Sequence, residues 1–126
     1  MQEVSSNNLQ SKSLLQRFEC WAYNLENGDL KKLKEMIYDG FLDPNESLIN
    51  GLTPLHIACI QGSLNGTKFL LNFGVDFDAL SLSERTPIDE ALLYKHFDCA
   101  IEIMIHKENH NSDFENKFLE QFLLFQ

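Results

Sequence analysis

Apolar residues recur at helical spacing in short segments of this chain, and turn residues separate the segments. Between Leu30 and Ile37, for example, the apolar positions fall three or four residues apart, on one face of a helix. Helices of this length are unstable alone in water. The pattern therefore predicts short helices that bury their apolar faces against one another.

Two Thr-Pro pairs mark predicted helix starts. Thr53 can cap a helix whose first residue is Pro54, because proline lacks the backbone N–H that would be unpaired at that position. Thr86 and Pro87 repeat the pair 33 residues later. A repeated structural unit of this period is the simplest explanation.

Glycine spacing extends the repeat toward the N-terminus. Twelve residues separate Gly28 from Gly40, and twelve separate Gly62 from Gly74. Gly40 and Gly74 stand where a helix commonly ends in a left-handed residue. Asp29 can cap the helix that ends at Gly40. A degenerate first unit is therefore expected before the central one.

The central unit resembles the ankyrin repeat. It contains Gly-Leu-Thr-Pro-Leu-His-Ile-Ala at 51–58, Gln-Gly-Ser-Leu at 61–64 and Phe-Leu-Leu-Asn-Phe-Gly-Val-Asp at 69–76. The resemblance covers roughly residues 18–107. It implies an all-α helical solenoid of about three repeats with capping helices at both ends, because terminal repeats are commonly atypical.

Departures from the family pattern fall mainly in the outer units. Gly66 stands inside a helix, where it costs about 1 kcal/mol relative to alanine. Glu84 and Lys95 replace turn glycines, Asp89 replaces the motif histidine, and Lys107 replaces the terminal glycine. The first and third units are therefore predicted to act as caps around one well-formed centre.

These observations divide the chain into five parts. Ser13 and Gln16 can form a capping box that begins an N-terminal helix, and Ser112 and Glu115 can begin another after a polar loop at 107–111. The expected parts are a disordered tail at 1–12, a capping helix with the degenerate first repeat at 13–50, the central repeat at 51–83, a degenerate third repeat at 84–108, and a Phe-rich amphipathic helix at 112–126.

The C-terminal segment repeats phenylalanine every four residues, at Phe114, Phe118 and Phe122. One interpretation is a helix that covers the open end of the stack. The other is a helix that binds a partner or associates with a second copy of the chain. Its polar face lacks the basic rim of a membrane-surface helix.

Composition limits the classes of partner and the cellular compartment that are expected. Lys plus Arg is 10 and Asp plus Glu is 19, so the net charge is −9 and direct nucleic-acid binding is not expected. No apolar run reaches the roughly 18 residues that a membrane span requires. The three cysteines are too sparse for a disulfide framework and indicate a cytoplasmic or nuclear protein.

No set of residues indicates catalysis, a cofactor or a metal. His106 and His110 have the spacing of two metal ligands on one helix face, but no further ligand accompanies them, and a solvated turn is expected there. His56 belongs to the repeat motif and is expected to hydrogen-bond within the fold. Cys59 is interpreted as a buried apolar residue. An enzyme is therefore not expected.

The resemblance implies protein binding through the concave face, formed by the loop tips and the first helix of each repeat. Most residues mapped to this surface are apolar or aromatic, as a docking surface requires. The predicted contacts are Ile49, Asn50, Leu52, Ile60, Gln61, Phe73, Leu82, Ser83, Arg85, Leu93 and Tyr94. Arg85 is expected to orient an acidic or carbonyl group of the partner.

A narrower resemblance concerns the segments at 36–38, 43–44, 51–53 and 68–75. They look like the ankyrin region of apoptosis-stimulating, tumour-suppressor-binding proteins and, less closely, of phosphatase-targeting subunits. This would make the chain a regulator of a protein phosphatase or a transcription factor. A self-associating structural protein that uses the C-terminal helix is the other alternative.

Overall fold

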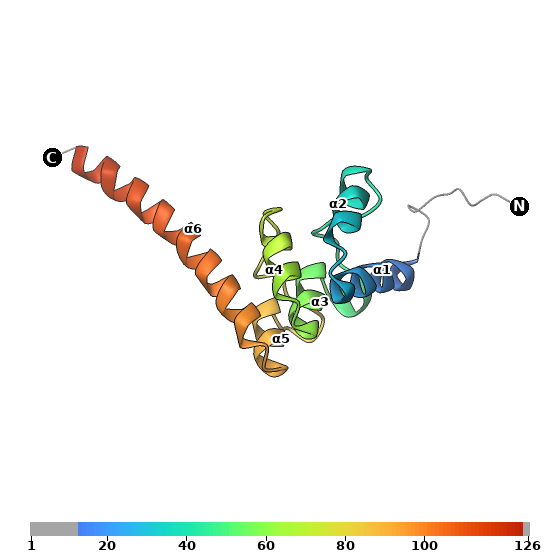
Figure 1. Cartoon of the computed structure of the whole chain (residues 1–126). Coiled ribbons are helices and arrows are strands. Elements are labelled where there is room, and N and C mark those ends of the chain that lie inside the picture. The colour runs from blue at the N-terminus through green and yellow to red at the C-terminus, as the bar shows by residue number, and fades with distance from the viewer. Residues whose placement is uncertain (1–12, 125–126) are drawn as a thin grey trace, which may run out of the picture.

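The computed structural model describes residues 13–124, with side chains from 13 to 110. Its helices are α1 (Leu14–Asn27), α2 (Leu30–Tyr38), the short 3-10 helix η2 (Ile49–Gly51), α3 (Pro54–Gln61), α4 (Leu64–Leu71), α5 (Pro87–Leu93) and α6 (Phe97–Leu124). This part of the chain contains no strand, and the predicted all-α repeat stack is confirmed (Figure 1). The tail predicted at 1–12 lies outside the described residues.

The core of the stack is the central unit. Helix α3 packs against α1 on one side and α5 on the other, and α4 packs against α3 and α6. All six residues from Pro54 to Cys59 are buried, so α3 has almost no solvent-facing side. The rest of the core comes from both flanking units, including Trp21, Leu33 and Ile103.

Four of the predicted helix starts, at Ser13, Asp29, Thr53 and Thr86, are confirmed. Ser13 forms a capping box with Gln16, and the Asp29 side chain accepts a hydrogen bond from the Lys32 backbone. Thr53 and Thr86 both cap helices that begin with proline. Each cap pairs a backbone N–H that the helix itself leaves unsatisfied.

His56 joins the central unit to the third. Its Nδ1 accepts a hydrogen bond from the Thr53 backbone N–H at 3.0 Å, so the proton of the neutral ring is on Nε2. Nε2 lies 2.8 Å from the Arg85 carbonyl oxygen and donates to it. Burial lowers the pKa of His56, with the Arg85 hydrogen bond opposing the shift. The imidazole is therefore a neutral bridge between two units.

Asp89 reproduces only half of this arrangement. Its carboxylate accepts a hydrogen bond from the Thr86 backbone N–H at 2.9 Å, as His56 does for Thr53. A carboxylate has no proton to donate onward at neutral pH. The substitution of the motif histidine thus keeps the helix cap and gives up the link to a further unit.

The predicted break at 107–111 is wrong, because one helix continues through it. Helix α6 runs from Phe97 to Leu124, so Ser112 lies inside a helix and does not cap a new one. The earlier outer helices α2 and α4 end at Tyr38 and Leu71, and each is followed by a left-handed glycine, Gly40 or Gly74, with φ of 83° and 72°. Lys107 stands at the corresponding place in α6, and nothing from 107 to 111 is Gly or Pro, so the helix lacks the glycine that follows the end of the earlier ones.

Gly66 has a packing role that propensity alone does not reveal. A Cβ at this position would lie 2.5 Å from Ser63 Oγ and 2.8 Å from Leu25 Cδ2. Ser63 Oγ also accepts a hydrogen bond from the Gly66 backbone and donates one to the Leu25 carbonyl. Glycine therefore permits the close approach of α4 to the end of α1.

Replacing Gly66 by alanine should lower stability despite the gain in helix propensity. The gain is about 1 kcal/mol, whereas overpacking a filled site costs about 1–3 kcal/mol. Asn65→Ala, at an exposed position of the same helix, is the matched control and should leave stability unchanged or raise it. Urea unfolding followed by Trp21 fluorescence measures both. A Gly66→Ala protein more stable than wild type would contradict the packing argument.

The free energy of unfolding should also decrease as the pH falls, because of His56. The unfolded histidine takes up a proton near pH 6.5, whereas the folded one resists it. Its contribution is therefore complete above about pH 6.5 and is lost as the pH falls toward the lowered pKa, at up to about 1.4 kcal/mol per pH unit.

The measurement compares the free energy of unfolding at pH 7.5 and pH 5.5. Wild type and the exposed-site control His110→Gln should lose stability between these values, and His56→Gln should lose less. Equal losses in all three proteins would show that His56 is not the titrating group.

Candidate functional site

The inner helices and loop tips enclose one small hollow of about 140 Å³. Six of the eleven residues predicted to contact a partner line it. The lining residues are Asn50, Leu52, Ile60, Ser81, Ser83, Arg85, Glu90 and Tyr94. The structure thus brings together residues from two loop tips and from helices α3 and α5.

Backbone hydrogen bonds position the two loop tips. In the first tip the Leu48 N–H donates to the Leu52 carbonyl at 2.8 Å, and 33 residues later Ser81 donates to Arg85 at 3.0 Å. The tips are also joined, because the Leu82 N–H donates to the Asn50 carbonyl at 3.0 Å. The polar backbone at this edge is therefore paired internally, which leaves the side chains to face outward.

Three of the tip and turn positions adopt left-handed backbone without glycine. Asn50 has φ of 61°, Glu84 has φ of 59° and Lys95 has φ of 64°. Asparagine tolerates this region, whereas for most other residues it costs roughly 1–2 kcal/mol. Glu84, which replaces a turn glycine, is thus a strained residue within an otherwise regular loop tip.

A partly buried ion pair forms one wall of the hollow. Glu90 is 2% exposed, and one of its carboxylate oxygens lies 3.2 Å from Arg85 Nε. An unpaired buried carboxylate would be strongly destabilising, so Glu90 holds the guanidinium in place. Among the described residues, no group accepts a hydrogen bond from the Arg85 Nη atoms, and the side chain is 42% exposed.

Glu90 is the functional candidate that the sequence interpretation missed. Asp89 and Glu90 read as a negative first helical turn, and both lie in the first turn of α5. The Glu90 side chain is also buried and pairs with Arg85. The five-residue spacing of the pair carries no recognisable signal, because it crosses from a loop into a helix.

Exposed apolar side chains belong to the lining of the hollow or adjoin it in the sequence. Leu82 is 79% exposed, Leu93 57% and Tyr94 50%, and Tyr94 stacks on the His96 ring. Ile49, which precedes Asn50 in η2, is half-buried. Exposed apolar side chains next to an ordered charged pair are typical of a protein-binding surface.

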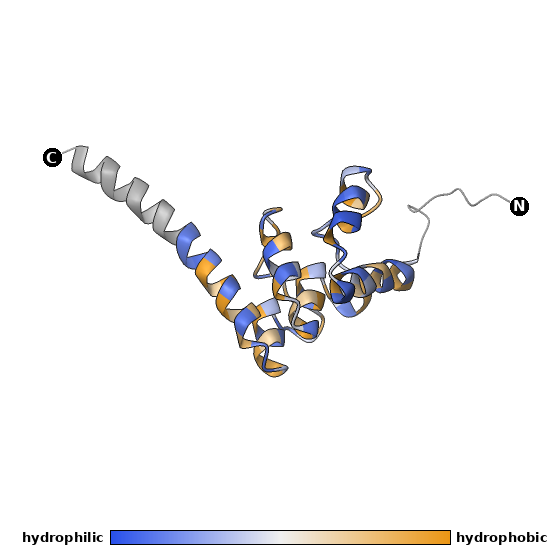
Figure 2. Ribbon diagram, viewed as in Figure 1, coloured by the Kyte–Doolittle hydropathy of each residue, from blue (hydrophilic) through white to orange (hydrophobic). Residues whose placement is uncertain are grey.

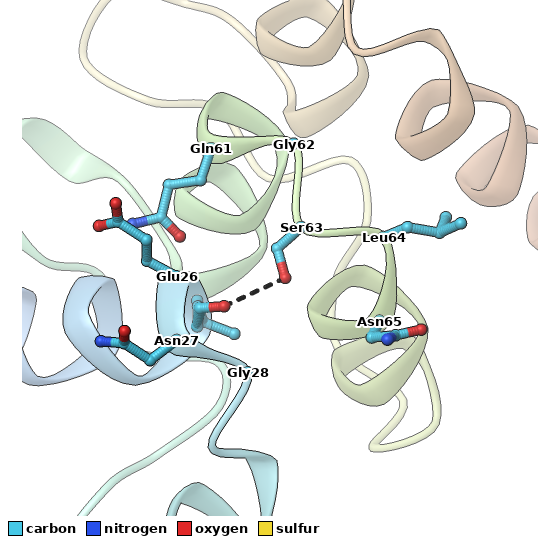
Figure 3. Close-up of a pocket in the computed structure, with 9 residues that line it drawn as sticks. Glu26, Asn27, Gly28, Gln61, Gly62, Ser63, Leu64 and Asn65 are labelled. Atoms are coloured by element: carbon cyan, nitrogen blue, oxygen red, sulfur yellow. Dashed lines mark hydrogen bonds between the residues drawn. The ribbon is translucent and has the colours of Figure 1, made fainter.

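Gln61 does not belong to this surface. Its amide Nε2 donates to the Ala22 carbonyl at 2.8 Å, which joins α3 to α1. It lines a different groove, where Ser63 Oγ also donates to the Leu25 carbonyl (Figure 3). Gln61 Oε1 is buried and has no hydrogen-bond partner in the described part of the chain. The prediction of Gln61 on the docking surface is therefore corrected to an inter-repeat contact.

Phe73 is also placed elsewhere. It packs edge-on against Phe69, with ring centroids 5.1 Å apart, and near Tyr38 of α2. These residues line a separate hollow between the second helices of the first two units. Phe73, the residue before the terminal glycine, thus packs in the outer layer formed by helices α2 and α4.

The remaining reactive side chains show no catalytic arrangement within residues 13–110. Burial raises the pKa of Cys59 to about 12, and burial also raises the pKa of Cys99. Such thiols are poor nucleophiles. No three metal-binding side chains cluster in this region.

His106 and His110 lie on α6 and not in the expected turn. Their rings are 6.2 Å apart, and both lie edge-on to Phe77. Lys107, between them, pairs with Asp78 at 3.0 Å. These aromatic contacts and the ion pair fasten α6 to the loop after α4.

No helix in the described residues is both long and apolar enough to cross a membrane.

Comparison with known proteins identifies the family to which the repeats belong. The pattern described as "Ankyrin repeats (3 copies)" matches residues 20–115. The chain is 36% identical over 66 residues to the tyrosine-protein kinase HTK16 of Hydra vulgaris, and 32% identical over 88 residues to the serine/threonine-protein kinase 12 of Arabidopsis thaliana. These matches cover 51% and 70% of the chain but only 9% and 19% of the two kinases.

Solved structures agree with this. A chain from the complex of the Bd0816 predatory endopeptidase of Bdellovibrio bacteriovorus with the immunity protein Bd3460 has a TM-score of 0.62 and 29% identity. The human ASB11 ankyrin repeat domain has a TM-score of 0.60 and 26% identity. Each match covers 68% of this chain, and 45% and 38% of the respective neighbours.

The matched pattern spans most of the chain, and the repeat geometry is that of its solved neighbours. The chain therefore belongs to the ankyrin-repeat family.

Proposed function

We propose that this chain is a non-catalytic adaptor or regulator that binds a protein partner at the hollow between its two loop tips. Ankyrin repeats are in general protein-interaction modules, and the matched kinases are much longer than this chain. Their catalytic activity therefore does not transfer to it. The proposal concerns only which surface binds and how.

The ordered Arg85–Glu90 pair surrounded by exposed apolar residues is the observation that supports this site. Glu90 orients the guanidinium through Nε, which leaves the Nη atoms available for a carboxylate or carbonyl group of a partner. Leu82 and Tyr94 offer apolar area on either side. An oriented charge gives specificity, and the apolar rim gives affinity.

The net charge of −9 favours partner segments that are basic overall, with one acidic or carbonyl group for Arg85. Regulation of a phosphatase or a transcription factor rests on the segment resemblances alone. The geometry of the hollow selects neither class of partner. Cytoplasmic or nuclear location likewise remains an expectation from cysteine usage.

The test is affinity capture from a cell extract followed by mass spectrometry. Leu82→Glu combined with Tyr94→Glu changes two exposed side chains, so the fold should survive. We expect wild type to enrich a protein that the double variant loses by at least about tenfold, equivalent to about 1.4 kcal/mol.

Tyr38→Glu, on the outer helix α2 and 70% exposed, is the control for added charge and should retain the partner. Retention of the same protein by the double variant would place binding on another surface. Enrichment of no protein by wild type would contradict the adaptor proposal itself.

A further inference from the structure

The third unit exposes residues that the central unit buries at equivalent positions. The 33-residue period aligns Leu92 with Cys59 and Met104 with Leu71. Cys59 and Leu71 are 0% and 3% exposed, because the third unit covers them. Leu92 and Met104 are 47% and 53% exposed. The outward side of the third unit is thus apolar, as the surface of an inter-repeat interface is.

Helix α6 is apolar on two opposite sides in its first turns. Cys99, Ala100 and Ile103 are buried in the core, whereas Phe97 and Ile101 are 55% and 53% exposed. Figure 2 shows hydrophobic bands alternating with hydrophilic ones along the start of α6. A helix that is hydrophobic nearly all round is normally buried. We define the end patch by its exposed members, which are Leu92, Phe97, Ile101, Met104 and Ile105.

The chain cannot cover the end patch with its own C-terminal segment while α6 is intact. The helix continues without a break to Leu124. At 1.5 Å per residue, its last turn lies roughly 30 Å along the axis from Met104. Within the described residues, the segment from 112 to 124 therefore does not cap the stack of its own chain, as one interpretation of the sequence expected.

We propose that a second copy of the chain covers the end patch, with the two α6 helices packed antiparallel. Three exposed residues in the first half of α6, Phe97, Ile101 and Ile105, repeat every four residues, as do the phenylalanines of its second half. A single antiparallel register therefore aligns these six positions. It sets Phe97 opposite Phe122, Ile101 opposite Phe118 and Ile105 opposite Phe114 of the second copy.

The same register places charges favourably. Glu102 falls opposite Lys117 of the second copy, whereas a parallel pair would set Glu102 against its own equivalent. The polar stretch at 107–111 lies at the centre, where the two-fold axis crosses the pair. Polar residues in the middle of an apolar seam oppose other registers. Because every contact occurs twice, the interface closes as a dimer.

Sedimentation equilibrium of the full chain tests the proposal. At tens of micromolar, wild type should have twice the 14.6 kDa mass of one chain. Ile101→Lys and Phe118→Glu should each be monomeric, because each buries two unpaired charges at the interface. The two variants mixed in equal amounts should form a dimer again, since the introduced lysine then faces the introduced glutamate.

Leu15→Lys adds the same charge at an exposed site of α1 and should remain dimeric. Circular dichroism establishes that each variant is folded. A monomeric wild type at 100 µM would overturn the proposal, and so would dimers that both variants leave intact. A mixture that stays monomeric would overturn the antiparallel register. The adaptor proposal uses a different surface, so the two can fail independently.

Discussion

The neutral imidazole of His56 is the contact on which the arrangement of the units depends. It receives a hydrogen bond from Thr53 at the start of α3 and gives one to the Arg85 carbonyl of the next loop tip. Only a neutral histidine protonated on Nε2 can do both. Because the ring is fully buried, its loss would leave polar backbone groups unpaired in the core.

The hollow between the two loop tips depends on this contact. Holding the Arg85 backbone fixes the loop tip against α3, and Glu90 then fixes the Arg85 side chain. The Arg85 guanidinium is thereby held in place beside exposed apolar residues. The third unit has Asp89 in place of the motif histidine, and it ends the chain of such bridges. Its outward side remains apolar even so, which leaves an interface without a partner in the isolated chain.

Local signals predicted most of the fold. The Thr-Pro pairs, the capping residues and the glycines at helix ends act through neighbouring backbone atoms, so they can be recognised in the sequence. The continuity of α6 was missed because the fold there depends on an absent signal, a glycine replaced by Lys107. Gln61, Phe73 and Glu90 were misplaced or overlooked because their roles depend on which neighbouring element each side chain meets, and periodicity does not encode this.

The most direct test of the account is NMR of the His56 ring nitrogens. At pH 7 the account predicts a proton on Nε2 and none on Nδ1, with a folded-state pKa below the ordinary histidine value of 6.5. A scalar coupling between Nε2 and the Arg85 carbonyl carbon should accompany it. A proton on Nδ1, or a folded-state pKa of 6.5 or higher, would contradict the bridge and the positioning of the site that depends on it.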